Sequence, residues 1–232
     1  MSSARSGSDG LPAISSRAAR RARAPGALNS GAPAPSVSYD HAKRAIDVLG
    51  ASVLLAVAAP AIVATAVAIR VTSRGPVLLR QQRLTERGRS FSLLKFRSMV
   101  ADAEGHEGAR FAEEGDRRVT PVGRIIRRTR LDELPQLLNV LCGDMSLIGP
   151  RPERPEIAKD LAQRIRGFER RLGARAGLTG LAQVVQGYPG DIEGYRRKLG
   201  LDLLYIKRKS LKLDVWIALK TVGVVLTGSG AR

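Results

Sequence analysis

The stretch VLGASVLLAVAAPAIVATAVAI, residues 48–69, is a continuous apolar run without a charged side chain. At about 1.5 Å of rise per residue, a helix of this length could cross the roughly 30 Å hydrocarbon core of a bilayer. Pro60 lies near its middle, where a proline removes a backbone hydrogen bond and bends a helix. The run therefore predicts a membrane-embedded helix that is bent at Pro60.

Basic residues flank this run on both sides: Lys43, Arg44, Arg70, Arg74 and Arg80. A helix that crosses the membrane usually shows a lopsided distribution of positive charge. We therefore predict that residues 39–70 form a re-entrant helix, which leaves the membrane on the side where it entered. A kinked helix that crosses once is the alternative. A buried helix of a soluble protein is the least favoured interpretation, because so long an uncharged run is rare in cores.

Charge and composition limit the partners of the rest of the chain. The 232 residues carry a formal charge of +18, so polyanions such as anionic lipid, nucleic acid or phosphorylated small molecules are expected partners. Aromatic residues make up only 4% of the chain, which argues against the base-stacking surfaces of single-strand binders. Residues 1–38 are rich in Ser, Ala, Gly, Pro and Arg and are predicted to be a disordered basic tail. Residues 71–232 are long enough for one domain.

The cysteine and histidine content excludes two kinds of site. Cys142 is the sole cysteine, so an intrachain disulfide is impossible, and its apolar neighbourhood LLNVLCG predicts a buried side chain. The two histidines, His41 and His106, share no recognisable ligand spacing. A zinc site or a histidine-based triad is therefore not expected.

Short apolar stretches predict an α+β fold that is mostly helical. Val77–Leu79 and Phe91–Leu94 are predicted as brief strands, with a turn at Gly88 between them. Near the C-terminus, WIALKTVGVVL (residues 216–226) predicts an amphipathic helix at the membrane interface, with Lys212, Trp216 and Lys220 as anchors. Packing of this helix into the core is the alternative.

Two adjacent carboxylates stand out in RRTRLDELPQ, residues 127–136. Leucines recur at helical spacing from Leu131, and Pro135 is tolerated only in a first turn, so Asp132 and Glu133 should lie at or just before a helix N-terminus. The helix end and the nearby arginines are expected to lower the pKa of a carboxylate there and keep it ionised. On these residues alone, simple helix capping is the better explanation.

A rigid loop, Gly149-Pro150-Arg151-Pro152, follows the helix and favours a catalytic role of the two carboxylates over simple capping. Its prolines fix the direction of Arg151, and an arginine held in this way suits bidentate phosphate binding. A surface turn with a solvated arginine is the alternative.

Five blocks in series resemble the bacterial sugar transferases that act as monotopic polyprenyl-phosphate phosphoglycosyltransferases. The resemblance begins near Tyr39 and runs to the C-terminus. The blocks are KRAIDVLGASVLLAVAAP (43–60), RGPVLLRQQRLTERGRSFSLLKFRSM (74–99), VGRIIRRTRLDELPQLLNVLCGDMSLIGPRP (122–152), GLTGLAQV (177–184) and LDLLYIKRKSLKLDVWIALKTVGVVL (201–226).

The resemblance implies an enzyme at the cytoplasmic face of a bacterial inner membrane, with residues 71–232 as its catalytic domain. Such an enzyme transfers a sugar-1-phosphate from a UDP-sugar to undecaprenyl phosphate and releases UMP, as the first membrane step of exopolysaccharide, capsule or other glycoconjugate synthesis. The family mechanism makes Asp132 the nucleophile that forms a covalent phosphosugar intermediate. Glu133 is the supporting acid, which assists Asp132 by helping to place the metal or by handling a proton. Mg²⁺ is the family cofactor and is expected near Asp132.

Further site residues follow from the same resemblance. Arg127 and Arg151 match phosphate-contacting positions, and Lys95 and Arg97 are assigned to substrate binding. The family's re-entrant helix breaks at a Ser-Pro pair, whereas this chain has Ala59 before Pro60. Ala176 also stands where the family usually has proline, which affects loop rigidity and not the reaction.

The expected partners are a UDP-sugar, undecaprenyl phosphate and membrane lipid, and no nucleic acid. A homodimer and contacts with other glycan-assembly enzymes are compatible with this class of protein. The competing interpretation is a non-catalytic, basic, membrane-anchored scaffold that binds anionic lipid or nucleic acid. Such a scaffold would spread its basic residues along one face, independently of the two carboxylates.

Overall fold

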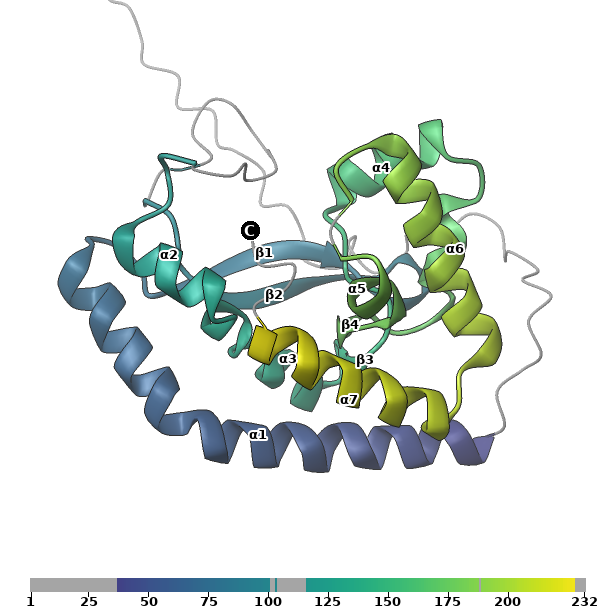
Figure 1. The fold of residues 1–232 in the computed structure, drawn as a ribbon, viewed down its shortest axis with the longest axis horizontal. Helices are drawn as coiled ribbons and strands as arrows, with labels where there is room; N and C mark the ends of the chain where they lie inside the picture. Colours follow the sequence, from purple (N-terminus) through teal and green to yellow (C-terminus); the bar gives the residue numbers. More distant parts are fainter. Residues whose placement is uncertain (1–36, 101–102, 104–115, 188, 228–232) are drawn as a thin grey trace, which may run out of the picture.

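The computed structural model describes residues 37–100, 103, 116–187 and 189–227, and it confirms a mostly helical α+β fold (Figure 1). The predicted tail, residues 1–38, falls outside the described residues except for its last two. In chain order, with η for a 3₁₀ helix, the elements are α1 (Val37–Thr72), β1 (Leu78–Leu84), η2 (Glu86–Gly88), β2 (Ser90–Phe96), α2 (Pro121–Arg128), η3 (Leu131–Glu133), α3 (Gln136–Cys142), β3 (Ser146–Ile148), α4 (Pro155–Arg164), η4 (Phe168–Gly173), β4 (Gly177–Thr179), α5 (Leu181–Val185), α6 (Ile192–Arg208) and α7 (Leu211–Thr227).

Helix α1 is continuous through Pro60, and Figure 1 shows that its axis bends partway along its length, as the proline predicts. The segment Ser38–Thr72 is the one helix in the described part of the chain that is long and apolar enough to cross a membrane. Its outward face carries apolar side chains that are each more than half exposed: Leu49, Val53, Val57, Val63, Val67 and Val71. An apolar surface of this extent on a single helix is typical of membrane association.

Both halves of α1 pack against the same domain. In the first half, Ala51 is fully buried in a core with Phe91 and Leu137. In the second half, Ile69 packs with Phe96 and Ile126. The domain therefore lies along the inner side of the bend, in contact with the helix before and after Pro60 (Figure 1).

The strands form two small sheets. β1 and β2 are an antiparallel hairpin, which confirms both predicted strands. Each is seven residues long, and β1 begins one residue later than predicted, at Leu78. β2 alternates between exposed and buried residues in its first half, so Phe91 and Leu93 face the core. β3 and β4 pair in parallel, and Gly149 at the end of β3 has no room for a side chain, since a Cβ there would lie 2.3 Å from the carbonyl oxygen of Arg175.

Helix α3 is fixed to the hairpin by a buried amide. The backbone N–H of Leu94 donates to Asn139 Oδ1, and Asn139 Nδ2 donates to the carbonyl of Ser92, both at 2.9 Å. This contact turns Leu137 and Val140 into the core and leaves Cys142 on the outer face of the helix. Cys142 is exposed, so the prediction that it is buried is wrong.

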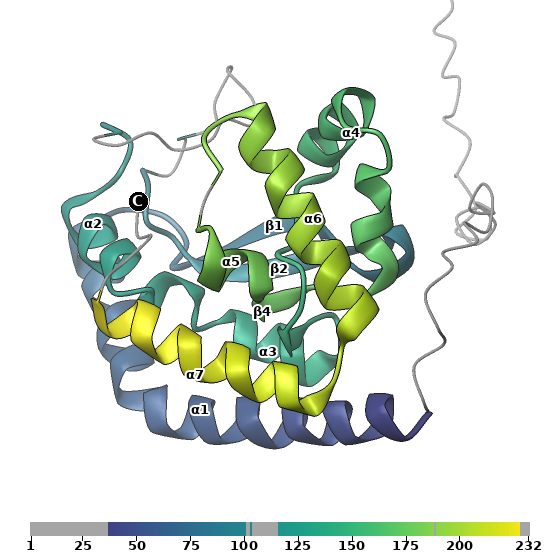
Figure 2. The same ribbon diagram turned by 45° about the vertical axis from the view of Figure 1, so that its right-hand side comes forward.

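Helix α7 uses two faces. Ile217 is fully buried beside Ile148 and Tyr205, whereas Trp216 and Leu219 are exposed together with Lys212 and Lys220. Lys220 Nζ lies 5.7 Å from the centre of the Trp216 ring. Core packing, the alternative interpretation, thus holds for one face of α7, whereas the other face is exposed and its location at the membrane interface stays a prediction. Figures 1 and 2 show α7 running beside the first half of α1.

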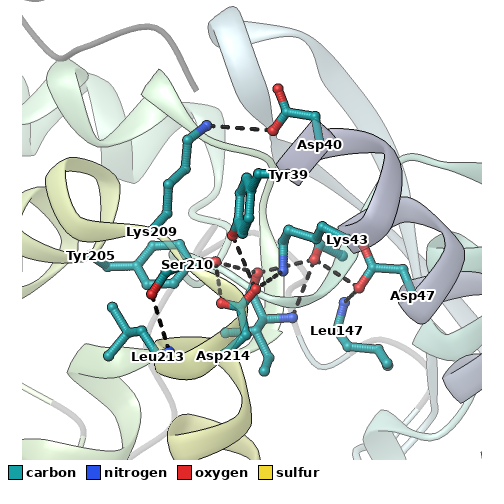
Figure 3. A network of polar contacts seen from close by, with 12 residues as sticks. Tyr39, Asp40, Lys43, Asp47, Leu147, Tyr205, Lys209, Ser210, Leu213 and Asp214 are labelled. Atoms are coloured by element: carbon teal, nitrogen blue, oxygen red, sulfur yellow. Dashed lines mark hydrogen bonds and ion pairs between the residues drawn. The ribbon is translucent and has the colours of Figure 1, made fainter. Parts of the chain in front are cut away.

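A polar network fastens the start of α1 to α7 and β3 (Figure 3). Lys43 Nζ and the Tyr39 hydroxyl each donate to Asp214 Oδ2 at 3.0 Å, and the Tyr205 hydroxyl donates to Asp214 Oδ1 at 2.9 Å. Asp47 accepts from the backbone N–H of Leu147 at 2.9 Å. These contacts fix the direction in which α1 leaves the domain.

The basic residues before the apolar run therefore form contacts within the protein. Lys43 is paired with Asp214, and Arg44 donates to the carbonyls of Val140 and Leu141 at the end of α3, at 2.6 and 2.8 Å. Neither side chain is simply solvated or directed at lipid headgroups.

Candidate active site

The two carboxylates lie on a short turn that follows α2. Arg130 adopts a left-handed backbone conformation, with φ of 60°, and the turn η3 begins directly after it. Such a conformation costs energy in a residue other than glycine and often marks a functional site. α3 begins at Gln136 after Pro135, which confirms that Asp132 and Glu133 lie just before a helix N-terminus.

Glu133 is neutralised by Arg151, the arginine of the proline-flanked loop. Arg151 Nη2 lies 2.5 Å from Glu133 Oε1, and Nη1 lies 3.4 Å from Oε2. Arg130 Nη1 approaches the same carboxylate at 4.0 Å. Burial alone would raise the pKa of Glu133, but Arg151 and the other nearby cations outweigh it and hold that pKa below its usual value.

Asp132 has no such partner. No hydrogen bond or ion pair joins its side chain to another residue within the described ranges, so it does not cap a backbone N–H of η3 or α3. Helix capping, the alternative explanation of the acidic pair, therefore does not apply to Asp132 in this structure.

Burial, followed by the negative charge of Glu133, raises the pKa of Asp132 to about 6. Lys95, Arg151 and Arg127 oppose this shift without overcoming it. The expectation that the arginines and the helix end lower this pKa is wrong, since the cost of burying the carboxylate is larger and Arg151 is engaged with Glu133. A carboxyl group with a pKa near 6 is still mostly ionised at neutral pH.

The structure brings three of the predicted cations to the acidic pair. Lys95, near the end of β2, has the largest attractive effect on Asp132, and Arg151 and Arg127 follow. Burial and the charges of Arg83 and Arg151 lower the pKa of Lys95 to about 8, so it is protonated at neutral pH and its charge is poorly solvated. A buried cation of this kind is suited to a phosphate.

Arg97, the fourth predicted cation, is directed elsewhere. Its Nη1 donates to the carbonyl of Arg74 at 2.7 Å, and its Nη2 donates to the carbonyl and the hydroxyl of Ser73 at 3.0 and 2.7 Å. With 4% of its surface exposed, Arg97 ties the end of α1 to β2. Its contacts are those of a structural residue, not of a group that faces the carboxylates.

The loop that carries Arg151 rests on a buried charge cluster. Arg171 Nη2 donates to the carbonyl of Arg151 at 2.7 Å, while its Nε donates to Asp202 at 2.9 Å. Glu153, two residues after Arg151, is paired with Lys198 and lies 3.9 Å from Arg171. The loop is thus held rigid, as its prolines predict, and Arg151 is fixed from behind.

Sequence reasoning missed this cluster, although a signal was present. Lys198, Asp202 and Tyr205 follow one another at spacings of four and three in α6, so they share one face of the helix. All three are buried. Charged residues at helical spacing on a face that also carries apolar residues indicate buried pairing.

The donor atoms present fit a magnesium ion bound together with substrate. No cluster of three or more His, Cys, Asp or Glu residues occurs among residues 37–100, 103, 116–187 and 189–227. Mg²⁺ does not require one, because it commonly binds one or two carboxylates together with substrate phosphates and water. The unpaired carboxylate of Asp132 is the available ligand, whereas both oxygens of Glu133 face Arg151.

A large cavity of about 730 Å³ adjoins the turn of the acidic pair, and Glu133 is part of its lining. It lies between α1 and α7, and most of its lining is aliphatic. Its wall includes Thr129, Arg130 and Glu133 from the turn and Leu54, Ala58 and Ala61 from α1. The site therefore has a charged part around Asp132 and an apolar part beside the membrane helix.

Comparisons with known proteins identify the family of the chain. Residues 38–228 match the family model described as bacterial sugar transferase. The chain is 48% identical over 198 residues to the UDP-N-acetylgalactosamine-undecaprenyl-phosphate N-acetylgalactosaminephosphotransferase of Aeromonas hydrophila, a match that covers 85% of this chain and 47% of that protein. It is 45% identical over 206 residues to the UDP-glucose:undecaprenyl-phosphate glucose-1-phosphate transferase of Caulobacter vibrioides, covering 88% of this chain and 77% of that protein.

The chain spans less than half of the Aeromonas relative and about three quarters of the Caulobacter one. An Escherichia coli protein named UDP-glucose:undecaprenyl-phosphate glucose-1-phosphate transferase is 38% identical over 183 residues, which is 78% of this chain and 39% of that protein. The family match covers nearly all of the described residues, including the membrane helix and the acidic pair. The chain belongs to the bacterial sugar transferase family.

Proposed function

We propose that this protein transfers a sugar-1-phosphate from a UDP-sugar to undecaprenyl phosphate and releases UMP. The names of the relatives support the substrate classes. The observation that carries the proposal is the state of the acidic pair: Glu133 is paired with Arg151, whereas the neighbouring Asp132 is unpaired, mostly ionised and surrounded by Lys95, Arg127 and Arg151.

In the first half-reaction, a carboxylate oxygen of Asp132 attacks the phosphorus that is bonded to the sugar. A new oxygen–phosphorus bond forms, the bond from this phosphorus to the bridging oxygen breaks, and its electron pair leaves with UMP. Lys95, Arg127 and Arg151 bind the charge on the diphosphate and orient it for attack. Mg²⁺, when bound at Asp132 and the substrate phosphates, would offset the charge that develops on the leaving phosphate.

In the second half-reaction, a phosphate oxygen of undecaprenyl phosphate attacks the same phosphorus and displaces the carboxylate of Asp132. The products are the lipid diphosphosugar and the regenerated aspartate. Neither half-reaction needs a proton acceptor, because each nucleophile is already an anion. Glu133 acts by holding Arg151 and Arg130 beside the phosphates.

The packing of α1 supports a re-entrant placement in the membrane, and we propose that the domain lies on the cytoplasmic face. Lys43 contacts Asp214 at one end of the helix, and Ile69 packs with Phe96 at the other. If the helix crossed the bilayer, its ends would lie on opposite sides of a hydrocarbon core roughly 30 Å thick. One small domain could not then contact both ends from the aqueous phase.

A panel of UDP-sugars tests the proposal. Purified full-length protein should release UMP from at least one of them in the presence of Mg²⁺ and undecaprenyl phosphate. The panel should include UDP-glucose and UDP-N-acetylgalactosamine, because the relatives are named for these sugars. Inactivity across the whole panel, with intact folding and lipid binding, would favour the non-catalytic scaffold.

A further inference from the structure

The cavity between α1 and α7 has the shape and chemistry of a site for one apolar chain. Aliphatic side chains of both helices face it, among them Leu54, Ala58, Ala218 and Val222. Leu147 and Leu178, from the β3–β4 sheet, line the side toward the domain. Its volume of about 730 Å³ falls within the range of ordinary ligand sites, so it is more than a packing defect.

The charged residues that line the cavity come from two places. Arg130 and Glu133 belong to the turn that also carries Asp132, although Asp132 itself is not part of the lining. Lys43, Asp47 and Asp214, which belong to the polar network of Figure 3, also line it, and they are satisfied by their own hydrogen bonds and ion pair. Among the described residues that line the cavity, the remaining charged side chains are Arg130 and Glu133, on the turn where Lys95, Arg127 and Arg151 act on Asp132.

An amphiphile with a phosphate at one end and one long hydrocarbon chain matches this distribution. We propose that the cavity binds the isoprenoid chain of the polyprenyl phosphate acceptor, with the acceptor phosphate directed toward the phosphosugar on Asp132. The inference rests on the proposed function, since it assumes that the acceptor phosphate reaches this carboxylate. It assigns the acceptor chain to the α1–α7 cavity and not to the outward stripe of α1 around Val57.

The orientation of the acceptor follows from the same geometry. Its phosphate must reach the phosphorus bound to Asp132, and the cavity extends to the turn that carries Asp132, since Arg130 and Glu133 are in its lining. An acyl chain of a bilayer phospholipid has similar chemistry along its length, but a phospholipid carries two such chains and a phosphate diester, whereas the second half-reaction needs a phosphate monoester on a single chain. The preferred occupant is therefore the acceptor.

Substitutions that narrow the cavity test the proposal. Ala58→Phe and Ala218→Phe place a ring into the cavity from α1 and from α7, respectively. Ala56→Phe is the matched control, because Ala56 is exposed on α1 and lies outside the cavity lining. Each full-length variant is assayed for UMP release from the donor without acceptor, and for turnover over a range of undecaprenyl phosphate concentrations.

We expect Ala58→Phe and Ala218→Phe to raise the KM for undecaprenyl phosphate about tenfold or more, as is usual when a hydrophobic pocket is mismatched to its ligand. UMP release from the donor alone should change far less, and Ala56→Phe should resemble the unaltered protein in both assays. An unchanged KM in both cavity variants, with the unaltered protein active, overturns the inference and leaves the proposed function standing. Absence of UMP release from the unaltered protein is a failure of the proposed function itself.

Photocrosslinking of the unaltered protein provides a second, independent measurement. A polyprenyl phosphate with a photoreactive group in its chain should label Ala58, Ala218 or other residues of the cavity lining, identified at single-residue resolution, and unlabelled undecaprenyl phosphate should compete. A phospholipid with the same group in its acyl chain should label the outward face of α1 instead. Labelling of the cavity by the phospholipid without competition from undecaprenyl phosphate would assign the cavity to bilayer lipid and contradict the inference.

Discussion

Arg151 forms a bidentate ion pair with Glu133, with Nη2 2.5 Å from Oε1. This pairing gives the two adjacent carboxylates, Asp132 and Glu133, different chemical properties. Glu133 is kept ionised as a structural partner of the arginine. Asp132 is left without a partner among the described residues, with its pKa raised to about 6 by burial and by Glu133. A group of this kind is a stronger nucleophile than an ordinary aspartate and is still mostly charged at neutral pH.

Arg151→Lys should reduce turnover tenfold to hundredfold, because lysine keeps the charge but cannot make both contacts with Glu133. Losing one hydrogen bond between charged groups costs roughly 1.5–3 kcal/mol, which corresponds to a rate effect of this size. Steady-state UMP release measures the effect. Arg164→Lys is the control, since Arg164 pairs at 3.0 Å with Asp160, both side chains are more than half exposed, and the change should be tolerated. Equal activity in the two variants would show that Arg151 has no special role in turnover.

Asp202→Asn should destabilise the protein by about 3 kcal/mol or more, because it leaves the buried charge of Arg171 with less compensation. Turnover should fall as well, since Arg171 also holds the carbonyl of Arg151. Asp160→Asn breaks the exposed pair with Arg164 and should cost less than about 1 kcal/mol. Thermal unfolding in detergent compares the two, and similar losses in both variants would contradict the supporting role of the cluster.

The stability of the fold should depend on Glu153 at acid pH. Burial raises the pKa of Glu153, but Lys198 and Arg171 outweigh it and hold that pKa below 4.5, the value expected in the unfolded chain. The folded state therefore binds this proton less readily than the unfolded state. Its contribution to stability is present above about pH 4.5 and is lost as the pH falls through the lower, folded value.

Glu153→Gln removes this titration. The variant should unfold at a lower temperature at pH 7, and its stability should fall less steeply than that of the unaltered protein between pH 5 and pH 3. Glu156→Gln, at an exposed neighbouring glutamate, should keep the full acid dependence. Parallel curves for Glu153→Gln and the unaltered protein would show that other groups cause the acid unfolding.

Local sequence rules predicted the elements that depend on neighbouring residues. Pro60 predicted the bend in α1, Gly88 the turn of the hairpin, and Pro135 the start of α3. Each of these follows from the backbone chemistry of one residue type. The mostly helical α+β class and the two hairpin strands were predicted for the same reason.

Features that depend on contacts distant in the chain were not predicted. Asp132 was expected to have a lowered pKa, because the sequence shows nearby arginines but not the burial that opposes them. Arg97 was expected at the substrate. Its partners are instead the carbonyls of Ser73 and Arg74, which follow α1 and are distant from Arg97 in the chain. Arg171 and Asp202, which are 31 residues apart, were not recognised as a pair.

The re-entrant placement of α1 predicts that both of its ends are on the same side of the membrane. In a Cys142→Ser background, single cysteines at Ser38 and at Thr72, both exposed, should react with a membrane-impermeant maleimide only after the cytoplasmic side is opened. Reaction of one of them in intact spheroplasts would show that the helix crosses the membrane. Pro60→Leu in the same background should favour crossing, because it restores the missing helical hydrogen bond.

Substitution of Asp132 should abolish catalysis without a matching loss of stability. Asp132→Asn keeps the shape of the side chain and removes the nucleophilic charge. Since Asp132 makes no capping hydrogen bond in this structure, its thermal unfolding should change little. Turnover should fall by several orders of magnitude, as happens when the nucleophile of a serine protease is removed, at a cost of about a million-fold.

The most direct measurement is covalent trapping of the sugar phosphate on the protein. Full-length protein is incubated with Mg²⁺ and a radiolabelled UDP-sugar without lipid acceptor, and then denatured and analysed for bound label. We expect the unaltered protein and, at lower yield, Glu133→Gln to retain the label. Hydroxylamine should release it, as expected for an acyl phosphate. Asp132→Asn should retain no label. Label at full yield on Asp132→Asn would contradict the assignment of Asp132 as the nucleophile.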